Sequence, residues 1–276
     1  MKKHIGTVCM ILMILTGLSL LLYPTVSNMQ NRLHSSQAIR QYADSVEQWE
    51  NRDRQKAWDD AATYNQTIYH LSRATDITEV SSSDYLSMLN VDANGMMGYV
   101  DIPKINCTLP IYHGTEAVTL ENYVGHLPSS SLPVGGGNTH CVLIGHTGMP
   151  SARLLTDLDK LTQGDTFTLR TLERTLTYEV DRILVVEPDE TEPLRIEPGK
   201  DYCTLVTCTP YGVNTHRLLV RGHRIENTPA ETARPSMGFV DWLLANPVVL
   251  ALAALLLLLM MTFWMTRRGI KREQRG

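Results

Sequence analysis

The sequence lacks an excess of positive charge. The whole chain has 25 lysine and arginine residues against 29 aspartate and glutamate residues. Seven basic residues and one acidic residue stand before residue 24 or after residue 246, so residues 24–246 hold 18 basic and 28 acidic side chains, a net charge of about −10. A nucleic-acid-binding surface needs the opposite sign, because it must neutralise phosphates. The composition therefore argues against a nucleic-acid partner.

The sequence also lacks the paired spacings of metal sites. It contains no Cys-x-x-Cys or His-x-x-x-His pair, and His140 and Cys141 point to opposite faces of the strand that the pattern predicts for them. A structural zinc is therefore disfavoured, although His140, Cys141, His146 and Cys208 are of ligand type. No internal repeat is present, and residues 135–137 are three glycines followed by a strand pattern, which favours a turn over a phosphate loop.

Two apolar stretches stand near the ends of the chain. Residues 5–23 and 247–265 contain no charged side chain, and each is close to the roughly 20 residues that cross a bilayer. The first could instead be a cleaved signal peptide, but it is long for one and no clean cleavage site follows, so we expect an uncleaved anchor. Basic residues lie in 1–4 and 266–276, and positive flanks stay in the cytoplasm. Both termini are therefore predicted to be cytoplasmic, with residues 24–246 outside.

The region between these stretches changes pattern once. Residues 35–71 show apolar positions at helical spacing, which predicts two amphipathic helices broken near 51–54, and the polar residues 72–90 predict a loop. From residue 98 the period is two and turn residues recur often, which indicates an all-β barrel or sandwich. The predicted strands are 98–102, 109–112, 139–144, 166–169, 175–187, 202–207 and 217–221, and one helix is predicted at 152–161.

Four cysteines fall in the predicted external part. They could form two disulfides, because exported domains normally pair their thiols or lack them. Cys107, Cys141 and Cys203 lie inside apolar strand-like runs, however, where a lone cysteine acts as a small buried hydrophobe. Cys208 stands at the end of such a run, beside the turn composition of residues 209–212, where a substrate can reach a thiol. Cys208 is therefore the candidate nucleophile.

A cysteine nucleophile needs a base and donors for the developing oxyanion. If the hairpin after Cys208 is centred between Gly212 and Val213, Arg217 faces Cys208 directly, at about 5 Å between Cβ atoms. A guanidinium there favours the thiolate and can donate two hydrogen bonds. Among nine histidines, His146 ends an apolar run within a glycine frame and so has the same strand-end position as Cys208. The pattern alone leaves the other histidines open.

These residues resemble the sortases, specifically the class C group that assembles pili. The resemblance is specific, covers about residues 95–226, and includes the arrangement of two spans with a basic C-terminal tail. The matching runs are 204–224 (TLVTCTPYGVNTHRLLVRGHR), 145–146 leading into 154–161, 98–105 and 111–115.

The resemblance implies a mainly β fold. It implies an eight-stranded sortase-type β-barrel at residues 95–226, preceded by a helical region with a candidate lid at 24–94 and followed by a linker at 227–246. A transmembrane helix would lie at each end, at 5–23 and 247–265.

The resemblance also implies a mechanism. Cys208 would attack the Thr–Gly bond of an LPxTG-like sorting signal, with His146 as acid and base and Arg217 stabilising the oxyanion, and a lysine amine of a pilin subunit would resolve the acyl-enzyme. No metal or organic cofactor is required. Thr147, Thr207 and Thr209 are the expected substrate-contacting neighbours.

Two positions depart from the family pattern. Thr147 stands where the family often has an arginine after the histidine, and no Asp-Pro-aromatic lid element occurs between residues 71 and 90. Asp76, Ile77, Asp84 and Tyr85 are the candidate lid residues instead. Two other functions are considered: a sortase that attaches surface proteins to peptidoglycan, and a non-catalytic membrane-tethered β-module with Cys208 buried or bonded to Cys203. The two cysteines are five positions apart on one strand, which places their side chains on opposite faces and disfavours that disulfide.

Overall fold

The computed structural model describes residues 2–73 and 82–227, without the side chains of residues 2–12, 14, 15, 18 and 82. The predicted membrane helix at 247–265, the basic tail, residues 228–246 of the linker, and Asp76 and Ile77 lie outside the described residues. The backbone of the predicted first span, 5–23, is helical. Where side chains are described, no helix combines the length and the apolar character needed to cross a membrane.

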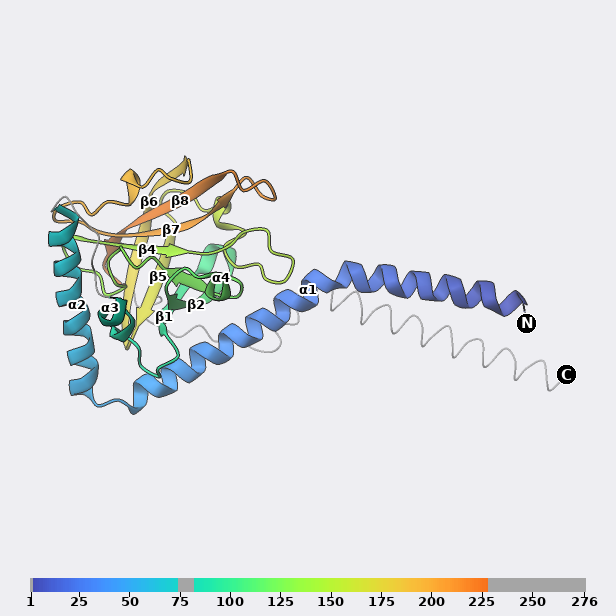
Figure 1. Ribbon diagram of the computed structural model, residues 1–276, viewed down its shortest axis with the longest axis horizontal. Helices are drawn as coiled ribbons and strands as arrows, with labels where there is room; N and C mark the ends of the chain where they lie inside the picture. Colours follow the sequence, from blue (N-terminus) through green and yellow to red (C-terminus); the bar gives the residue numbers. More distant parts are fainter. Residues whose placement is uncertain (1, 74–81, 228–276) are drawn as a thin grey trace. The chain divides into compact units, whose positions relative to one another are not determined.

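Short runs of period two build a closed barrel within the described part of the chain (Figure 1). The strand order is β1-β2-β3-β4-β7-β8-β6-β5, which confirms the eight-stranded barrel. Neighbouring strands are antiparallel except β2–β3 and β4–β7, which are parallel. The bounds are β1 Met96–Ile102, β2 Cys107–His113, β3 Val124–His126, β4 Thr139–Ile144, β5 Thr166–Thr171, β6 Arg174–Val186, β7 Asp201–Thr209 and β8 His216–Ile225.

Seven of these strands match predicted runs within a few residues, and β4 has the predicted bounds. The eighth, β3, is only Val-Gly-His, too short to show alternation. The predicted helix at 152–161 is wrong, because this segment forms turns followed by the short 3-10 helix η2 (Leu158–Lys160). Leu154 has φ +39°, which no α-helix accommodates. Three further short helices are α4 (Ala117–Leu120), η1 (Pro103–Ile105) and η3 (Glu192–Leu194).

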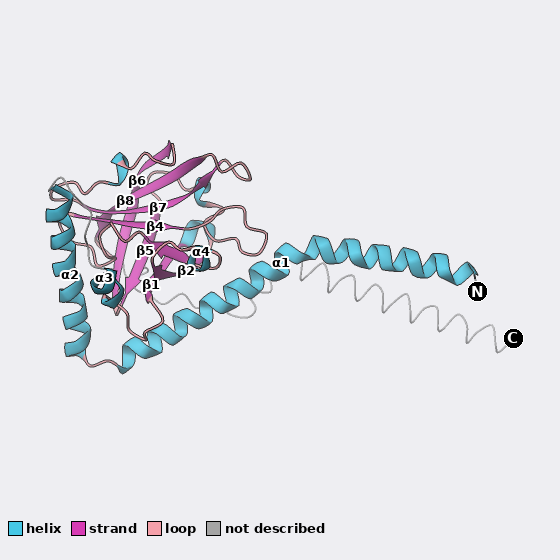
Figure 2. Ribbon diagram, in the orientation of Figure 1, coloured by secondary structure: helices cyan, strands magenta, loops and turns pink. Residues whose placement is uncertain are grey.

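Two long helices precede the barrel (Figure 2). They are α1 (Lys2–Gln48) and α2 (Asn51–Arg73), so the break falls at residues 49–50, just before the predicted 51–54. Arg54 stabilises the end of α1, because its Nη1 donates to Val46 O at 2.8 Å and to Trp49 O at 2.6 Å. Tyr42 Oη donates to Met97 O at 2.8 Å, which fixes α1 on β1.

The α2 helix is attached to the barrel by a buried amide. Asn65 bonds both backbone groups of Leu132, donating to the carbonyl at 3.1 Å and accepting from the N–H at 2.7 Å. The apolar faces of both helices join the barrel core, as the helical spacing predicts.

The predicted loop at 72–90 is wrong for residues 82–87, which form α3 (Ser82–Ser87). Tyr85 is buried, with only 5% of its surface exposed. Its hydroxyl accepts from Gly114 N at 2.9 Å and lies 3.0 Å from His126 Nδ1. The buried Tyr85 ring, whose hydroxyl is hydrogen-bonded, fixes this short helix against the barrel.

The sheet region around β4, β7, β8 and β6 is apolar on both faces. Cys203 and Leu205 of β7 face the barrel core, together with Leu143 of β4. The alternate positions Val142, Val186, Val206 and Leu219 form a second cluster on the outer face, against which Leu127, Ile144, Leu184 and Leu194 pack. We call these eight residues the outer apolar stripe.

Candidate active site

Cys208 and Arg217 face each other across the β7–β8 hairpin. The register pairs Cys208 with Arg217 and Thr209 with His216, which confirms the pairing predicted from the position of the turn. Both strands here are antiparallel, so directly opposite side chains share a face and lie within contact distance.

His146 extends the same row on the other side of Cys208. The parallel β4–β7 register pairs Ile144 with Val206, and it continues past the end of β4 because Gly145 N donates to Val206 O at 3.0 Å. Thr207 Oγ1 then donates to Gly145 O at 2.7 Å. Extended by two residues beyond the Ile144–Val206 pair, this parallel register brings His146 to the level of Cys208. The three candidate residues therefore lie in one row across the ends of β4, β7 and β8.

This row lies on the outer face of the barrel. Side chains alternate along a strand, so Cys208 shares the face of Val206 in the outer apolar stripe, whereas Cys203 faces the core. All four cysteines with described side chains are free. The opposite faces of Cys203 and Cys208 agree with the expectation that they do not form a disulfide.

Of the other three cysteines with described side chains, two are almost fully buried. Cys141 and Cys203 pair across β4–β7, with 2% and 0% of their surfaces exposed. Cys107 begins β2 and is half-buried rather than inside an apolar run. Burial raises the pKa of the Cys107 thiol to about 12, and its Sγ donates to Leu154 O at 3.4 Å. Cys208 is half-buried at the end of its strand.

The arginines of β8 have different partners. Arg217 Nη1 donates to His216 O at 3.1 Å, and among the described residues no carboxylate forms an ion pair with it. Arg221 is engaged by Asp181 and Glu197, each at 3.0 Å. Unlike Arg221, the Arg217 guanidinium beside Cys208 is therefore not engaged by a described carboxylate.

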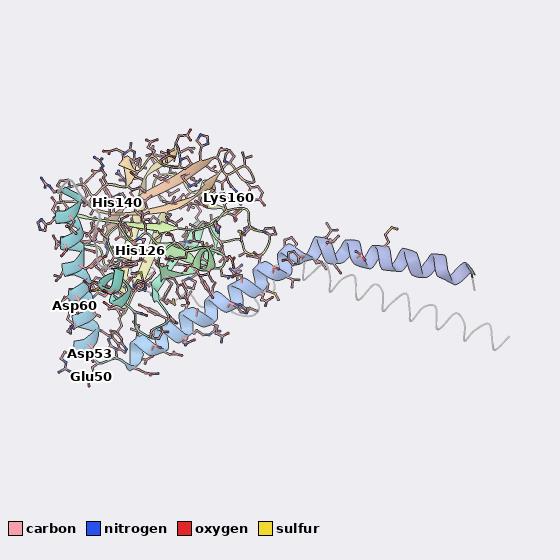
Figure 3. The ribbon with its side chains drawn as sticks, in the orientation of Figure 1. Glu50, Asp53, Asp60, His126, His140 and Lys160 are labelled. Carbon is pink, nitrogen blue, oxygen red and sulfur yellow. The ribbon has the colours of Figure 1, made fainter. Side chains whose placement is uncertain are left out.

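Most histidines other than His146 are held by structural bonds. His140 Nε2 lies 2.7 Å from Thr204 Oγ1 and its Nδ1 lies 2.9 Å from Arg195 O. His126 Nε2 lies 2.9 Å from Ser131 O. Both are buried among the barrel strands (Figure 3). Burial lowers the pKa of His140 and of His113 below the ordinary 6.5.

His146 is half-buried, and no hydrogen bond to its ring occurs within the described part of the chain. Its position next to Cys208 separates it from the buried histidines. The sequence could not make that distinction.

The three threonines expected near the substrate have different environments. Thr207 is 3% exposed, and its hydroxyl supports Gly145 from the inner face. Thr147 is also buried, at 9%. Thr209 is half-buried at the end of β7. Thr209 is the one of the three that shares both the strand end and the exposure of Cys208.

The candidate lid residues that are described lie in α3. Tyr85 is buried against His126, whose strand partner is Leu143. Leu143 precedes His146 by three residues, about 10 Å along an extended chain, so Tyr85 anchors its segment at a distance from Cys208.

A small pocket opens on the same outer face as Cys208, and the sequence pattern had not revealed it. Thr204 at its wall precedes Cys208 by four strand residues, which corresponds to about 13 Å. The lining residues are Arg182, Leu184, Pro193, Thr204, Leu219 and Arg221. Apolar residues on both faces of a strand leave no alternation, which is why the pattern did not reveal this surface.

Within the described residues, no group of three or more histidine, cysteine, aspartate or glutamate side chains could hold a metal ion.

Known proteins resemble the chain in sequence and in structure. The family model described as Sortase domain matches residues 100–225. Sortase D of Bacillus subtilis is 34% identical over 131 residues, which cover 46% of this chain and 63% of that protein. The crystal structure of sortase C1 from Streptococcus agalactiae superposes with a TM-score of 0.65 at 50% identity, over 70% of this chain and 100% of that one. The structure of sortase C from Streptococcus pneumoniae, reported with insights into pilin substrate specificity, gives a TM-score of 0.63 at 41% identity, over 69% of this chain and 97% of that one.

Proposed function

Since this chain belongs to the sortase family of cysteine transpeptidases, we propose that it polymerises pilin subunits. It cleaves an LPxTG-like sorting signal between threonine and glycine and transfers the acyl group to a lysine amine of another subunit. The observation that carries the proposal is the pairing of Cys208 with Arg217 across β7 and β8, with His146 two residues past the end of the neighbouring strand β4.

His146, Cys208 and Arg217 support both halves of an acyl-transfer reaction, formation of a thioester and attack on it by an amine. The Cys208 thiolate attacks the threonine carbonyl carbon, and hydrogen bonds from the Arg217 guanidinium stabilise the oxyanion. The bond to glycine breaks as the glycine nitrogen takes a proton from His146, leaving a thioester on Cys208. In the second half the lysine amine attacks the thioester carbonyl and gives a proton to His146. An isopeptide bond forms, and Cys208 leaves as a thiolate.

The outer apolar stripe supports binding of an extended apolar signal. It crosses β4, β7, β8 and β6 on the face that Cys208 shares, and the pocket at Thr204 lies about 13 Å from the thiol along the strand. An extended peptide whose threonine is at Cys208 would put its leucine, three residues earlier, about 10 Å away. Leu184 and Leu219 offer that leucine apolar contacts.

The acceptor is assigned to a pilin lysine instead of a peptidoglycan amine. The support is likeness: the Streptococcus pneumoniae sortase C, whose structure was reported with insights into pilin substrate specificity, shares 41% identity over nearly all of its length. A surface-protein-anchoring sortase is the second candidate. The non-catalytic β-module is wrong, because the chain is a member of an enzyme family and Cys203 lies in the core on the face opposite Cys208.

Sortases are typically membrane-associated at the cell surface. We propose spans at 5–23 and 247–265, both termini in the cytoplasm, and the catalytic domain outside a Gram-positive cell. The support is the two apolar stretches and their basic flanks. The candidate lid, with Asp76 and Ile77 as well as Asp84 and Tyr85, belongs to the same proposal.

One experiment tests the reaction and the acceptor together. The purified chain is incubated with a sorting-signal peptide and either a lysine-bearing pilin domain or a peptidoglycan-type amine, and products are identified by mass spectrometry. We expect a thioester on Cys208, an isopeptide ladder with the pilin domain and no activity in Cys208→Ala. A product only with the peptidoglycan-type amine would contradict the pilin assignment, and cleavage by Cys208→Ala would contradict the mechanism.

A further inference from the structure

The segment that follows His146 contains one unfavourable backbone conformation. Leu154 has φ +39°, in the left-handed region that side chains with a Cβ atom rarely adopt. Such a conformation persists only where the surrounding structure holds it in place. We call residues 147–157 the histidine segment.

Hydrogen bonds hold the backbone on both sides of Leu154. Arg153 N donates to Asn28 Oδ1 of α1 at 3.0 Å, and Leu154 O accepts from Cys107 Sγ at 3.4 Å. The next residue, Leu155, donates its N–H to His146 O at 3.2 Å. A single residue, Leu154, therefore separates the Asn28 contact from the bond that fixes the backbone of His146.

The α1 helix offers more than one contact in this region. Asn31 is 7% exposed, and its Nδ2 donates to Asn122 O at 3.4 Å. Arg32, four residues after Asn28 and so on the same helix face, is close enough to Cys107 to oppose the effect of burial on that thiol. Asn28 is thus part of a helix face that contacts the barrel, and its bond to Arg153 is the contact that reaches the histidine segment.

We propose that Asn28 is a positioning residue for His146. Its side-chain oxygen holds the backbone at Arg153, the Leu154 conformation is maintained, and the Leu155 bond keeps His146 beside Cys208. The helix that carries the predicted membrane anchor would then determine whether the thiol and the imidazole are aligned. The effect on turnover rests on the proposed function, whereas the effect on the histidine segment does not.

Three variants of the full chain in detergent isolate this contact. Asn28→Leu removes the acceptor, and Asn28→Asp keeps an oxygen acceptor of the same length. Gln30→Leu is the matched control, because Gln30 is exposed on the same helix and the change adds the same side chain. Thermal unfolding of all three is compared first, since one surface hydrogen bond should not alter the fold.

Two measurements need no sorting signal. Amide exchange of the peptide covering residues 150–158 should be about tenfold faster in Asn28→Leu and unchanged in the other two variants. The pH profile of Cys208 alkylation by iodoacetamide should shift to higher pH in Asn28→Leu only, because a displaced imidazole no longer favours the thiolate. With a sorting-signal peptide, kcat should fall about fivefold to tenfold in Asn28→Leu, with KM within twofold of wild type.

The outcomes separate the two proposals. If the wild-type chain does not cleave the peptide, the proposed function fails, and exchange and alkylation still decide the role of Asn28. Unchanged exchange and an unchanged alkylation profile in Asn28→Leu would overturn the positioning role. Equal effects of Asn28→Leu and Gln30→Leu would also overturn it, because they would reflect the added leucine.

Discussion

At the scale of single residues, the four thiols with described side chains differ in exposure. Alkylation needs a thiolate, and burial raises the pKa of Cys107 to about 12, which leaves about one thiolate in 10⁴ at pH 8. Cys141 and Cys203 are almost fully enclosed. Iodoacetamide at pH 8 should therefore label Cys208 at least 100-fold faster than Cys107, Cys141 or Cys203, as measured by peptide mapping.

The control for this labelling is the unfolded chain, in which all four thiols should react at similar rates. In native Cys208→Ala, the other three thiols should remain unlabelled. Labelling of Cys107 at a rate near that of Cys208 would show that its contact with Leu154 O does not protect it.

At the scale of elements, Arg221 of β8 holds the connection between β6 and β7, residues 187–200, near its C-terminal end. The guanidinium pairs with Asp181 through two 3.0 Å bonds and with Glu197 through a third, and it lies 4.0 Å from the centre of the Tyr202 ring. Arg221→Ala should destabilise the fold by about 1–3 kcal/mol, because it removes hydrogen bonds between charged groups. It should raise KM severalfold with a smaller change in kcat, because the connection contributes Leu194 to the outer apolar stripe, where the proposed signal binds.

Arg224→Ala is the matched control for that prediction. Arg224 also bridges β8 and β6, with Nη1 donating to Thr177 O at 3.0 Å, but it has no contact with the β6–β7 connection among the described residues. Chemical denaturation and peptide-cleavage kinetics should show a stability loss in both variants and a KM effect in Arg221→Ala alone. A KM effect of equal size in both would mean that general loosening of the sheet is responsible.

The same elements show what the sequence could predict and what it could not. The Cys208–Arg217 pairing was predictable, because a short hairpin turn fixes the register of antiparallel strands. The placement of His146 near Cys208 was not, because it depends on the register of β4 and β7, which are parallel and joined by more than 50 residues of chain. His146 therefore rested mainly on resemblance. The predicted helix at 152–161 failed because its apolar residues are buried by tertiary contacts in a turn that helical periodicity does not anticipate.

At the scale of the whole molecule, one helix joins the predicted anchor to the catalytic end of the barrel. No break interrupts α1 between residues 23 and 28, and five helical residues span about 7.5 Å. With a membrane span at 5–23, the contact between Asn28 and Arg153 would lie close to the lipid surface. The site would then meet sorting signals near the membrane, where the proposed anchor keeps the enzyme.

Stability of the whole fold should depend on pH through its buried histidines. Burial lowers the pKa of His113 and His140 below 6.5, so the unfolded state binds protons that the folded state does not. Their contribution is complete above about 6.5 and is lost as the pH falls toward the folded pKa values. Between pH 7 and 5.5 the loss should reach at most about 1.3 kcal/mol for each histidine, the value for a folded state that stays unprotonated.

Urea unfolding of wild type, His140→Gln and His34→Gln at both pH values tests this linkage. His140→Gln should reduce the loss between pH 7 and 5.5, whatever its effect at pH 7, because the glutamine does not titrate. His34→Gln, at an exposed position of α1, is the control and should leave the difference as in wild type. If wild type is equally stable at pH 7 and 5.5, the buried histidines must take up protons without unfolding. The bond between His140 and Arg195 O would then persist in the charged form and would tighten the β6–β7 connection at low pH.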